Sequence, residues 1–336
     1  MARMFKRSFL FLLSVTTLLF MSTVQYDGKT PMQQLSVAGF PFFASVDLAP
    51  APVVADSVAS AAAAPVAEED APIRNLRSLS DKALRAKLEK RIKANPTWRK
   101  LLAKKRMSVG VVDMSRGERV KYAALNGRHM MYAASLPKIA VLAAAHDAIE
   151  RGELKETPEV KRDMRLMIAK SNNAATTRMI DRVGFENIER TMTDPALKLY
   201  DPEYGGGLWV GKRYAAGGRR YPDPIKGISH AATTEQICRY FYLLANNELV
   251  SPESSRKMRT YLVDPQLHHK FVSVLDQVAP EAKVYRKSGS WSSFHADVAM
   301  VQGPERDYII TALVDDPNGE RICRELARVL DDLLTN

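Results

Sequence analysis

The chain has 336 residues, of which 46% are hydrophobic and 26% are charged, and this ordinary globular composition excludes a chain that is disordered throughout. The 49 Lys and Arg residues outnumber the 38 Asp and Glu residues, giving a formal net charge of +11 that would suit a polyanionic partner. The basic residues are spread along the chain and are not interleaved with aromatic residues, so nucleic acid is not expected as a partner.

The chain begins with the features of an export signal. Arg3, Lys6 and Arg7 precede an apolar run over residues 9–24. We expect residues 1–25 to be a signal peptide or an uncleaved signal anchor, because the run is short for a spanning helix and no clear cleavage site follows it. The protein would then be exported to a periplasmic or other extracytoplasmic location, either free or tethered to the inner membrane.

A low-complexity segment follows the signal. Residues 26–75 are rich in Ala, Pro, Val and Ser and show no sustained hydrophobic period, which predicts a disordered linker. The folded domain is expected at residues 76–336. Its first helix is predicted to begin at the N-cap Ser80 and to end at Asn95 and Pro96.

The next elements are a hairpin and a buried helix. Residues 108–113 and 118–123 form two short β-like runs joined by a turn sequence, which predicts a β-hairpin. Residues 136–150 are mostly Ala, Val, Ile and Leu, and Gly152 closes the run, so this helix should be buried on most sides. Further helical patterns occupy residues 160–170, 174–183 and 233–249.

Strand patterns return near the C-terminus, at residues 283–288, 294–301 and 308–314, before a last amphipathic helix. This order predicts an α/β (α+β) fold in which both chain ends build one antiparallel sheet flanked by helices. An all-helical lobe, at about residues 146–270, would be inserted between the two halves of the sheet. A functional site is expected in the groove between the sheet and the lobe.

Three short motifs carry the candidate chemistry. In the first, S-L-P-K at residues 135–138, Ser135 is the predicted N-cap of the buried helix and Lys138 lies one turn later. A lysine that opens an apolar helix is expected to have a lowered pKa, which suits a base for a serine hydroxyl. Taken alone, the motif could equally be a capping serine with a lysine whose charge reaches the surface.

The second and third motifs complete the set. S-N-N at residues 171–173 falls where one helical pattern ends and the next begins, a place where Ser and Asn also serve as ordinary capping residues. K-S-G at residues 287–289 ends a predicted strand and is followed by Ser290. Glycine there permits close backbone approach, and an edge strand with free N–H groups can hold an extended amide substrate.

In this order the motifs resemble S-x-x-K, S-D-N and K-T-G of the serine β-lactamases and penicillin-binding proteins, in particular the class A β-lactamase-like group. The resemblance extends from about residue 107 to the C-terminus. It implies the β-lactamase/transpeptidase-like fold and a serine hydrolase without a cofactor. The substrate would be a small-molecule β-lactam or a peptidoglycan stem peptide.

The resemblance implies a role in bond breaking for four residues. Ser135 would attack the substrate carbonyl, and Lys138 would accept its proton. Ser171 would pass a proton to the departing nitrogen. Lys287 would keep a positive charge near Lys138 and the substrate carboxylate.

The resemblance also implies how the substrate is bound. Asn173 would bond the substrate amide and Ser288 its carboxylate, next to the close approach that Gly289 permits. The backbone N–H groups of Ser135 and Ser290 would form the oxyanion hole.

The segment that should supply the deacylating base departs from the family pattern. Class A β-lactamases use a glutamate in an E-P-E-L-N loop to activate water, and the nearest match here is Y-D-P-E-Y at residues 200–204. Asp201 would take the base position with a shorter reach, and Glu203 is the neighbouring acid. Without a working base the acyl-enzyme would persist, as in a penicillin-binding protein.

Two kinds of function stay open. An acyl-transfer enzyme would hydrolyse β-lactams or, alternatively, act as a D-alanyl-D-alanine peptidase on peptidoglycan. The other kind is a tethered, catalytically silent cell-wall-binding protein that retains the cleft.

Other site patterns are weaker. Residues 206–212 match the phosphate-loop pattern G-x-x-x-x-G-K, but Arg213 replaces the Ser or Thr that would hold magnesium. The histidines lack metal-ligand spacing, so no metal is expected. Cys238 and Cys323 lie in apolar helical patterns, which favours two buried thiols over one disulfide.

Overall fold

The computed structural model describes residues 75–335. The predicted signal (residues 1–25) and all of the predicted linker (26–75) except Asn75 lie outside the described residues. Within residues 75–335, no helix combines the length and the apolar character needed to cross a lipid bilayer.

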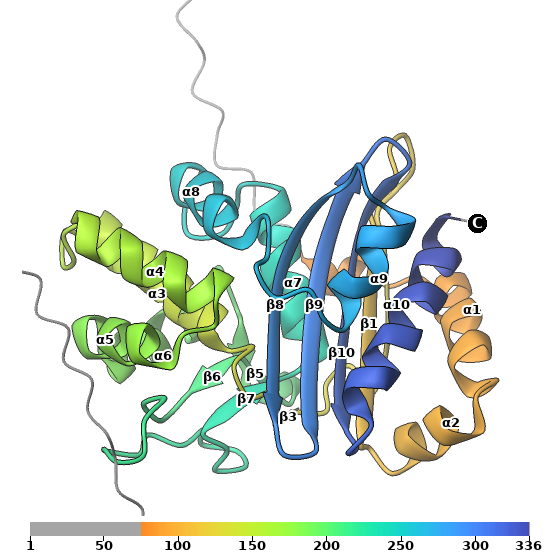
Figure 1. The fold of residues 1–336 in the computed structure, drawn as a ribbon, viewed down its shortest axis with the longest axis horizontal. Helices are drawn as coiled ribbons and strands as arrows, with labels where there is room; N and C mark the ends of the chain where they lie inside the picture. Colours follow the sequence, from red (N-terminus) through yellow and green to blue (C-terminus); the bar gives the residue numbers. More distant parts are fainter. Residues whose placement is uncertain (1–74, 336) are drawn as a thin grey trace, which may run out of the picture. The chain divides into compact units, whose positions relative to one another are not determined.

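A five-stranded antiparallel sheet with the strand order β2-β1-β10-β9-β8 forms the centre of the described chain (Figure 1). Its strands are β1 (Met107–Asp113), β2 (Lys121–Leu125), β8 (Lys283–Trp291), β9 (Phe294–Gly303) and β10 (Arg306–Asp315). The prediction that both ends of the folded chain build one antiparallel sheet is confirmed. The predicted hairpin is β1 with β2, in which Val111 stands opposite Ala123. The strand that carries the third motif, β8, lies at the edge of the sheet.

One face of the sheet is covered by helices from the beginning and the end of the described chain (Figure 1). These helices are α1 (Lys82–Lys93), α2 (Pro96–Ala103), α9 (Phe271–Val278) and α10 (Gly319–Thr335). Leu88 of α1 and Leu326 of α10 are buried in the same apolar cluster as Val109 of β1. Burial of this amphipathic face holds the helices against the sheet.

The start of α1 differs by one residue from the prediction. Asp81, not Ser80, is the N-cap, and its carboxylate accepts a hydrogen bond from the Leu84 N–H at 2.7 Å. Ser80 instead ends the short 3₁₀ helix η1 (Leu76–Leu79), to which its own N–H is bonded. The prediction failed because both residue types cap helices well, and only one can be in register with the first turn.

The opposite face of the sheet carries α7 (Thr234–Ala245), which lies between the sheet and the remaining helices (Figure 1). These are α3 (Lys138–Glu150), α4 (Pro158–Ala169), α5 (Asn173–Val183), α6 (Phe185–Thr193) and α8 (Pro252–Leu262). The predicted buried helix is α3, and most of its residues are inaccessible to solvent. Cys238 and Cys323 are both free and buried, as their apolar surroundings in the sequence indicated.

Short strands that the sequence patterns did not predict lie around the segment 200–232 and next to the first motif. They are β3 (Met131–Tyr132), β4 (Tyr200–Asp201), β5 (Gly206–Gly207), β6 (Trp209–Val210) and β7 (His230–Ala232). In this region β7 pairs with both β3 and β6, and β4 pairs with β5. Strands of two or three residues are too short to show alternation in a sequence. Their importance is local, because the first motif begins three residues after the end of β3.

Candidate active site

Ser135 lies in the tight turn between β3 and α3. The Leu136 N–H donates to the Ala133 carbonyl at 3.0 Å, and the Lys138 N–H donates to the Ser135 carbonyl at 3.3 Å. Pro137 is the N-cap of α3, and no side chain caps this end. The prediction that Ser135 caps the helix is therefore wrong, because the turn places it two residues before the N-cap. Within residues 75–335 the Ser135 hydroxyl has no hydrogen-bond partner, so it is available for chemistry.

Lys138, the first residue of α3, is fully buried and directs its amine toward the second motif. Its Nζ donates to the Ser171 carbonyl at 2.6 Å and to Asn173 Oδ1 at 2.8 Å, and it lies 3.4 Å from Ser171 Oγ. Burial lowers the pKa of Lys138 to about 7. A substantial neutral fraction therefore exists at neutral pH, and a neutral amine can accept the proton of a serine hydroxyl.

Lys287 of β8 also contacts the Ser171 hydroxyl. Its Nζ donates to Ser171 Oγ at 2.9 Å and to the Ser288 carbonyl at 2.7 Å. Burial, followed by the charge of Lys138, holds the pKa of Lys287 well below its usual range. Lys138, Ser171 and Lys287, which we call the amine cluster, thus join two buried amines through one hydroxyl, and protonation of one disfavours protonation of the other.

The loop between α4 and α5 presents Ser171 to these amines. Ser171 has a positive φ of 53°, a conformation that a non-glycine residue seldom adopts. The following residue, Asn172, caps α5 by accepting a hydrogen bond from the Ala175 N–H at 2.8 Å. The second motif therefore combines two tasks, since Asn172 fixes the helix start while Ser171 and Asn173 contact Lys138.

Gly289 brings β8 against the turn that carries Ser135. A Cβ atom at Gly289 would lie 2.3 Å from the Ala133 carbonyl oxygen and 2.6 Å from the Ser135 nitrogen, so no side chain fits there. The Ser135 N–H has no acceptor within residues 75–335. Ser290 follows on β8 and is exposed. The first and third motifs are therefore adjacent, and a free backbone donor lies between them.

Sequence comparison assigns the chain to a family. Residues 87–165 and 155–334 match the model named Beta-lactamase2, described as the β-lactamase enzyme family. The chain belongs to the β-lactamase enzyme family. None of the curated proteins matches this sequence.

Solved structures share the fold of this β-lactamase family member at low sequence identity. The β-lactamase from Sphaerobacter thermophilus is 16% identical, with a TM-score of 0.55, over 73% of this chain and 95% of that chain. PBP-A is 16% identical, with a TM-score of 0.55, over 75% of this chain and 96% of that chain. A β-lactamase from Xanthomonas campestris pv. campestris is 15% identical, with a TM-score of 0.55, over 75% of this chain and 97% of that chain. The predicted β-lactamase/transpeptidase-like fold is confirmed, and the activity has to be argued from the site.

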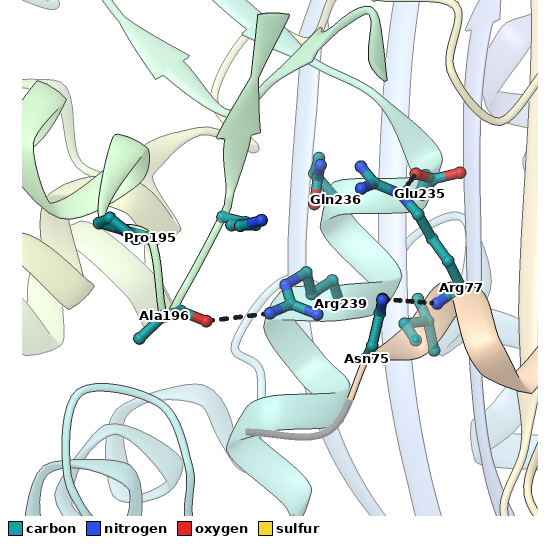
Figure 2. Close-up of a pocket in the computed structure, with 9 residues that line it drawn as sticks. Asn75, Arg77, Pro195, Ala196, Glu235, Gln236 and Arg239 are labelled. Carbon is teal, nitrogen blue, oxygen red and sulfur yellow. Dashed lines mark hydrogen bonds and ion pairs between the residues drawn. The ribbon is translucent and has the colours of Figure 1, made fainter. Parts of the chain in front are cut away.

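Asp201 and Glu203, the acids predicted to serve deacylation in this family member, do not join the amine cluster. Asp201 pairs with Arg77 at 3.3 Å and accepts a hydrogen bond from the Glu203 N–H at 3.2 Å, while the Glu203 side chain is exposed. Figure 2 shows Arg77 beside Glu235, with which it also pairs at 2.6 Å. We call Arg77, Asp201 and Glu235 the Asp201 cluster. Within residues 75–335, neither Lys138 nor Lys287 forms an ion pair with a carboxylate.

The cavity in Figure 2 lies beside the Asp201 cluster and not at the motifs. It has a volume of about 310 Å³ and is lined by Arg77, Glu235, Gln236 and Arg239, among others. None of the predicted catalytic or substrate-binding residues lines it. Lys287 and Ser288 of the third motif instead line a much smaller cavity of about 10 Å³.

Two residues of the site were missed by the sequence analysis. Lys270 is fully buried behind β8, and its Nζ donates to the Gly289 carbonyl at 2.5 Å and to the Ala296 carbonyl at 3.2 Å. Tyr214 donates from its hydroxyl to the Ala134 carbonyl at 3.0 Å, and its ring centroid lies 4.5 Å from Lys138 Nζ. Neither residue sits in a motif or a periodic pattern, so no sequence signal could have found them.

Proposed function

We propose that this protein is a serine hydrolase whose Ser135 is acylated by β-lactams or related amides. The observation that carries the proposal is the amine cluster beside the Ser135 turn, with two buried amines that share the Ser171 hydroxyl. Buried lysines without carboxylate partners are costly to keep, which favours a catalytic use over a structural one.

Acylation can be written with these residues. Neutral Lys138 accepts the proton of the Ser135 hydroxyl as its oxygen attacks the substrate carbonyl carbon. The free Ser135 N–H, with the N–H of Ser290, stabilises the negative oxygen that develops. The carbon–nitrogen bond then breaks, and the Ser171 hydroxyl gives its proton to the leaving nitrogen while it is reprotonated from an amine of the cluster.

Substrate binding would use the neighbouring polar groups. Asn173 is exposed at the mouth of the site and keeps its amide nitrogen for a substrate carbonyl. Lys287 and Ser288 would meet a substrate carboxylate at the end of β8, where a cation next to a hydroxyl suits an anionic group. Both β-lactams and D-alanyl-D-alanine peptides present an amide carbonyl beside a carboxylate.

A peptidase or penicillin-binding protein is the second candidate within the same chemistry. The observation that favours it is the Asp201–Arg77 ion pair, which engages the acid predicted to activate the deacylating water. A catalytically silent cell-wall-binding protein is disfavoured by the amine cluster, because binding alone needs no lysine with a lowered pKa. Export and a membrane tether stay predictions that rest on residues 1–25.

The proposal is tested by incubating the purified full chain with a fluorescent penicillin. We expect a covalent label that maps to the peptide containing Ser135 and is absent from the Ser135→Ala variant. A wild-type chain that is folded by circular dichroism and takes up no label under any condition would overturn the acyl-transfer proposal and favour the silent binding protein.

A further inference from the structure

Tyr214 is an aromatic side chain that contacts both the base and the nucleophile turn. Its ring lies 4.5 Å from Lys138 Nζ, and its hydroxyl donates to the carbonyl of Ala134, the residue before Ser135, at 3.0 Å. One side chain thus contacts both the amine of Lys138 and the backbone just before Ser135. We propose that Tyr214 covers the side of Ser135 from which water would attack the acyl-enzyme, so that the acyl-enzyme is long-lived.

The Tyr214 ring packs against the imidazole ring of His230 on β7. The two ring centroids are 4.2 Å apart, and His230 is buried, with its Nε2 at 3.1 Å from the Lys212 carbonyl. Burial lowers the pKa of His230 to about 4, so the imidazole is neutral and packs as an uncharged ring at neutral pH. Its own carbonyl accepts a hydrogen bond from the Ala133 N–H at 2.8 Å, which ties β7 to the nucleophile turn. Tyr214 therefore packs on β7, which is itself bonded to the nucleophile turn.

The Ala134 backbone explains why the hydroxyl contact matters. Ala134 has a positive φ of 50°, which a residue with a side chain seldom adopts. Such a conformation persists only where the surroundings fix it. The Tyr214 hydroxyl bonds the carbonyl of this strained residue, so covering the site and holding the Ser135 turn are done by the same side chain.

Tyr214 cannot itself act as a deacylating base. Its hydroxyl donates its proton to the Ala134 carbonyl, and burial raises the pKa of the phenol well above its usual range. Hydrolysis of an ester at Ser135 needs a water molecule within hydrogen-bond reach of a base. Within residues 75–335, the hydrogen bonds of Lys138, Ser171 and Tyr214 involve no carboxylate, and the ring fills the space next to the amine.

This inference rests on the proposed function, and one experiment separates the two. The full chain is acylated with penicillin G, excess drug is removed, and the mass of the intact protein is followed over time. The Tyr214→Ala variant should lose its adduct about tenfold faster than the wild type, because water can then reach the ester beside Lys138. The Tyr214→Phe variant loses the bond to the Ala134 carbonyl but keeps the ring that would exclude water, so its adduct should decay at close to the wild-type rate.

A control on the same segment guards against a general loosening of the loop. Tyr221 stacks on Trp209 and bonds Glu189, and the Tyr221→Phe variant removes only that hydroxyl contact. We expect its adduct to be as long-lived as that of the wild type. If Tyr214→Ala does not fold, the smaller change Tyr214→Leu, which keeps an apolar side chain but opens the space above Lys138, gives the same comparison.

The outcomes distinguish the two claims. An adduct that forms in all variants and decays equally fast in Tyr214→Ala, Tyr214→Leu and the wild type would overturn the role of Tyr214 and leave the acyl-transfer proposal standing. The absence of an adduct in the wild type would overturn the acyl-transfer proposal and this inference with it. Faster decay in Tyr214→Ala or Tyr214→Leu, with Tyr214→Phe unchanged, supports both.

Discussion

The amine cluster and the Asp201 cluster differ in how their charges are treated. In the amine cluster, Lys138 and Lys287 are buried and form no ion pair with a carboxylate of residues 75–335, and the pKa of each is lowered by burial. In the Asp201 cluster, both Asp201 and Glu235 are paired with the Arg77 guanidinium. Unpaired buried charge is costly and is kept where it is used, whereas paired charge is an ordinary structural feature. Under the proposed function, the amine cluster supplies the groups for acylation, while Asp201, the candidate deacylating acid, is engaged in an ion pair with Arg77.

The largest expected effect comes from removing the base. The Lys138→Met variant keeps most of the side-chain volume but loses the amine, so the rate of penicillin acylation should fall by about 10²- to 10⁴-fold. The rate is measured from adduct mass against time. A matched control is Lys170→Met, which removes an exposed amine at the end of α4 and should not change the rate. Equal acylation rates in Lys138→Met and the wild type would mean that the amine cluster has no more part in acylation than the Asp201 cluster.

The close approach of β8 to the nucleophile turn gives the next effect. The Gly289→Ala variant places a Cβ 2.3 Å from the Ala133 carbonyl oxygen, so the strand must move away from Ser135. Overpacking of this kind should lower the free energy of unfolding by about 1–3 kcal/mol and should also slow acylation. Urea unfolding and adduct formation are both measured. A variant with wild-type stability and rate would mean that the first and third motifs do not need this contact.

The smallest expected effect comes from a change in the Asp201 cluster. The Asp201→Asn variant loses an ion pair at a partly exposed site, so the free energy of unfolding should fall by less than about 1 kcal/mol. The lifetime of the penicillin adduct should stay within about twofold of the wild type, since the account gives Asp201 no part in moving the proton of water. Glu203→Gln, on an exposed side chain, serves as its matched control. A much longer lifetime in Asp201→Asn alone would identify Asp201 as the deacylating base.

The sheet and the buried helix could be predicted because their patterns are long. The alternating or continuous apolar runs at β9 and β10 and the apolar stretch of α3 extend over many residues, and burial of those residues fixes the elements. The short strands β3 to β7 offer no such length. The cap at Asp81 and the turn at Ser135 depend on a register of one or two residues, which is below what propensity can resolve.

The order of the motifs indicated Ser135, Lys138, Ser171 and Lys287 before their positions in space were known. The contacts of Lys270 and Tyr214 could not be predicted, because both residues reach the site from irregular segments far away in the sequence. The same limit applies to Asp201, whose partner Arg77 lies 124 residues earlier in the chain. A local sequence match could therefore suggest Asp201 as a base, but it could not show that Asp201 forms an ion pair with Arg77.

The pH dependence of acylation tests the central claim most directly, because the account requires a neutral Lys138. The rate constant of penicillin acylation is measured with the full chain at a series of pH values, on either side of neutrality. Since burial lowers the pKa of Lys138 to about 7, the rate should be low in acid, rise through about pH 7 and level off above it as the amine loses its proton. A rate that stays constant across this range, or one that falls as the pH rises through 7, would contradict the account.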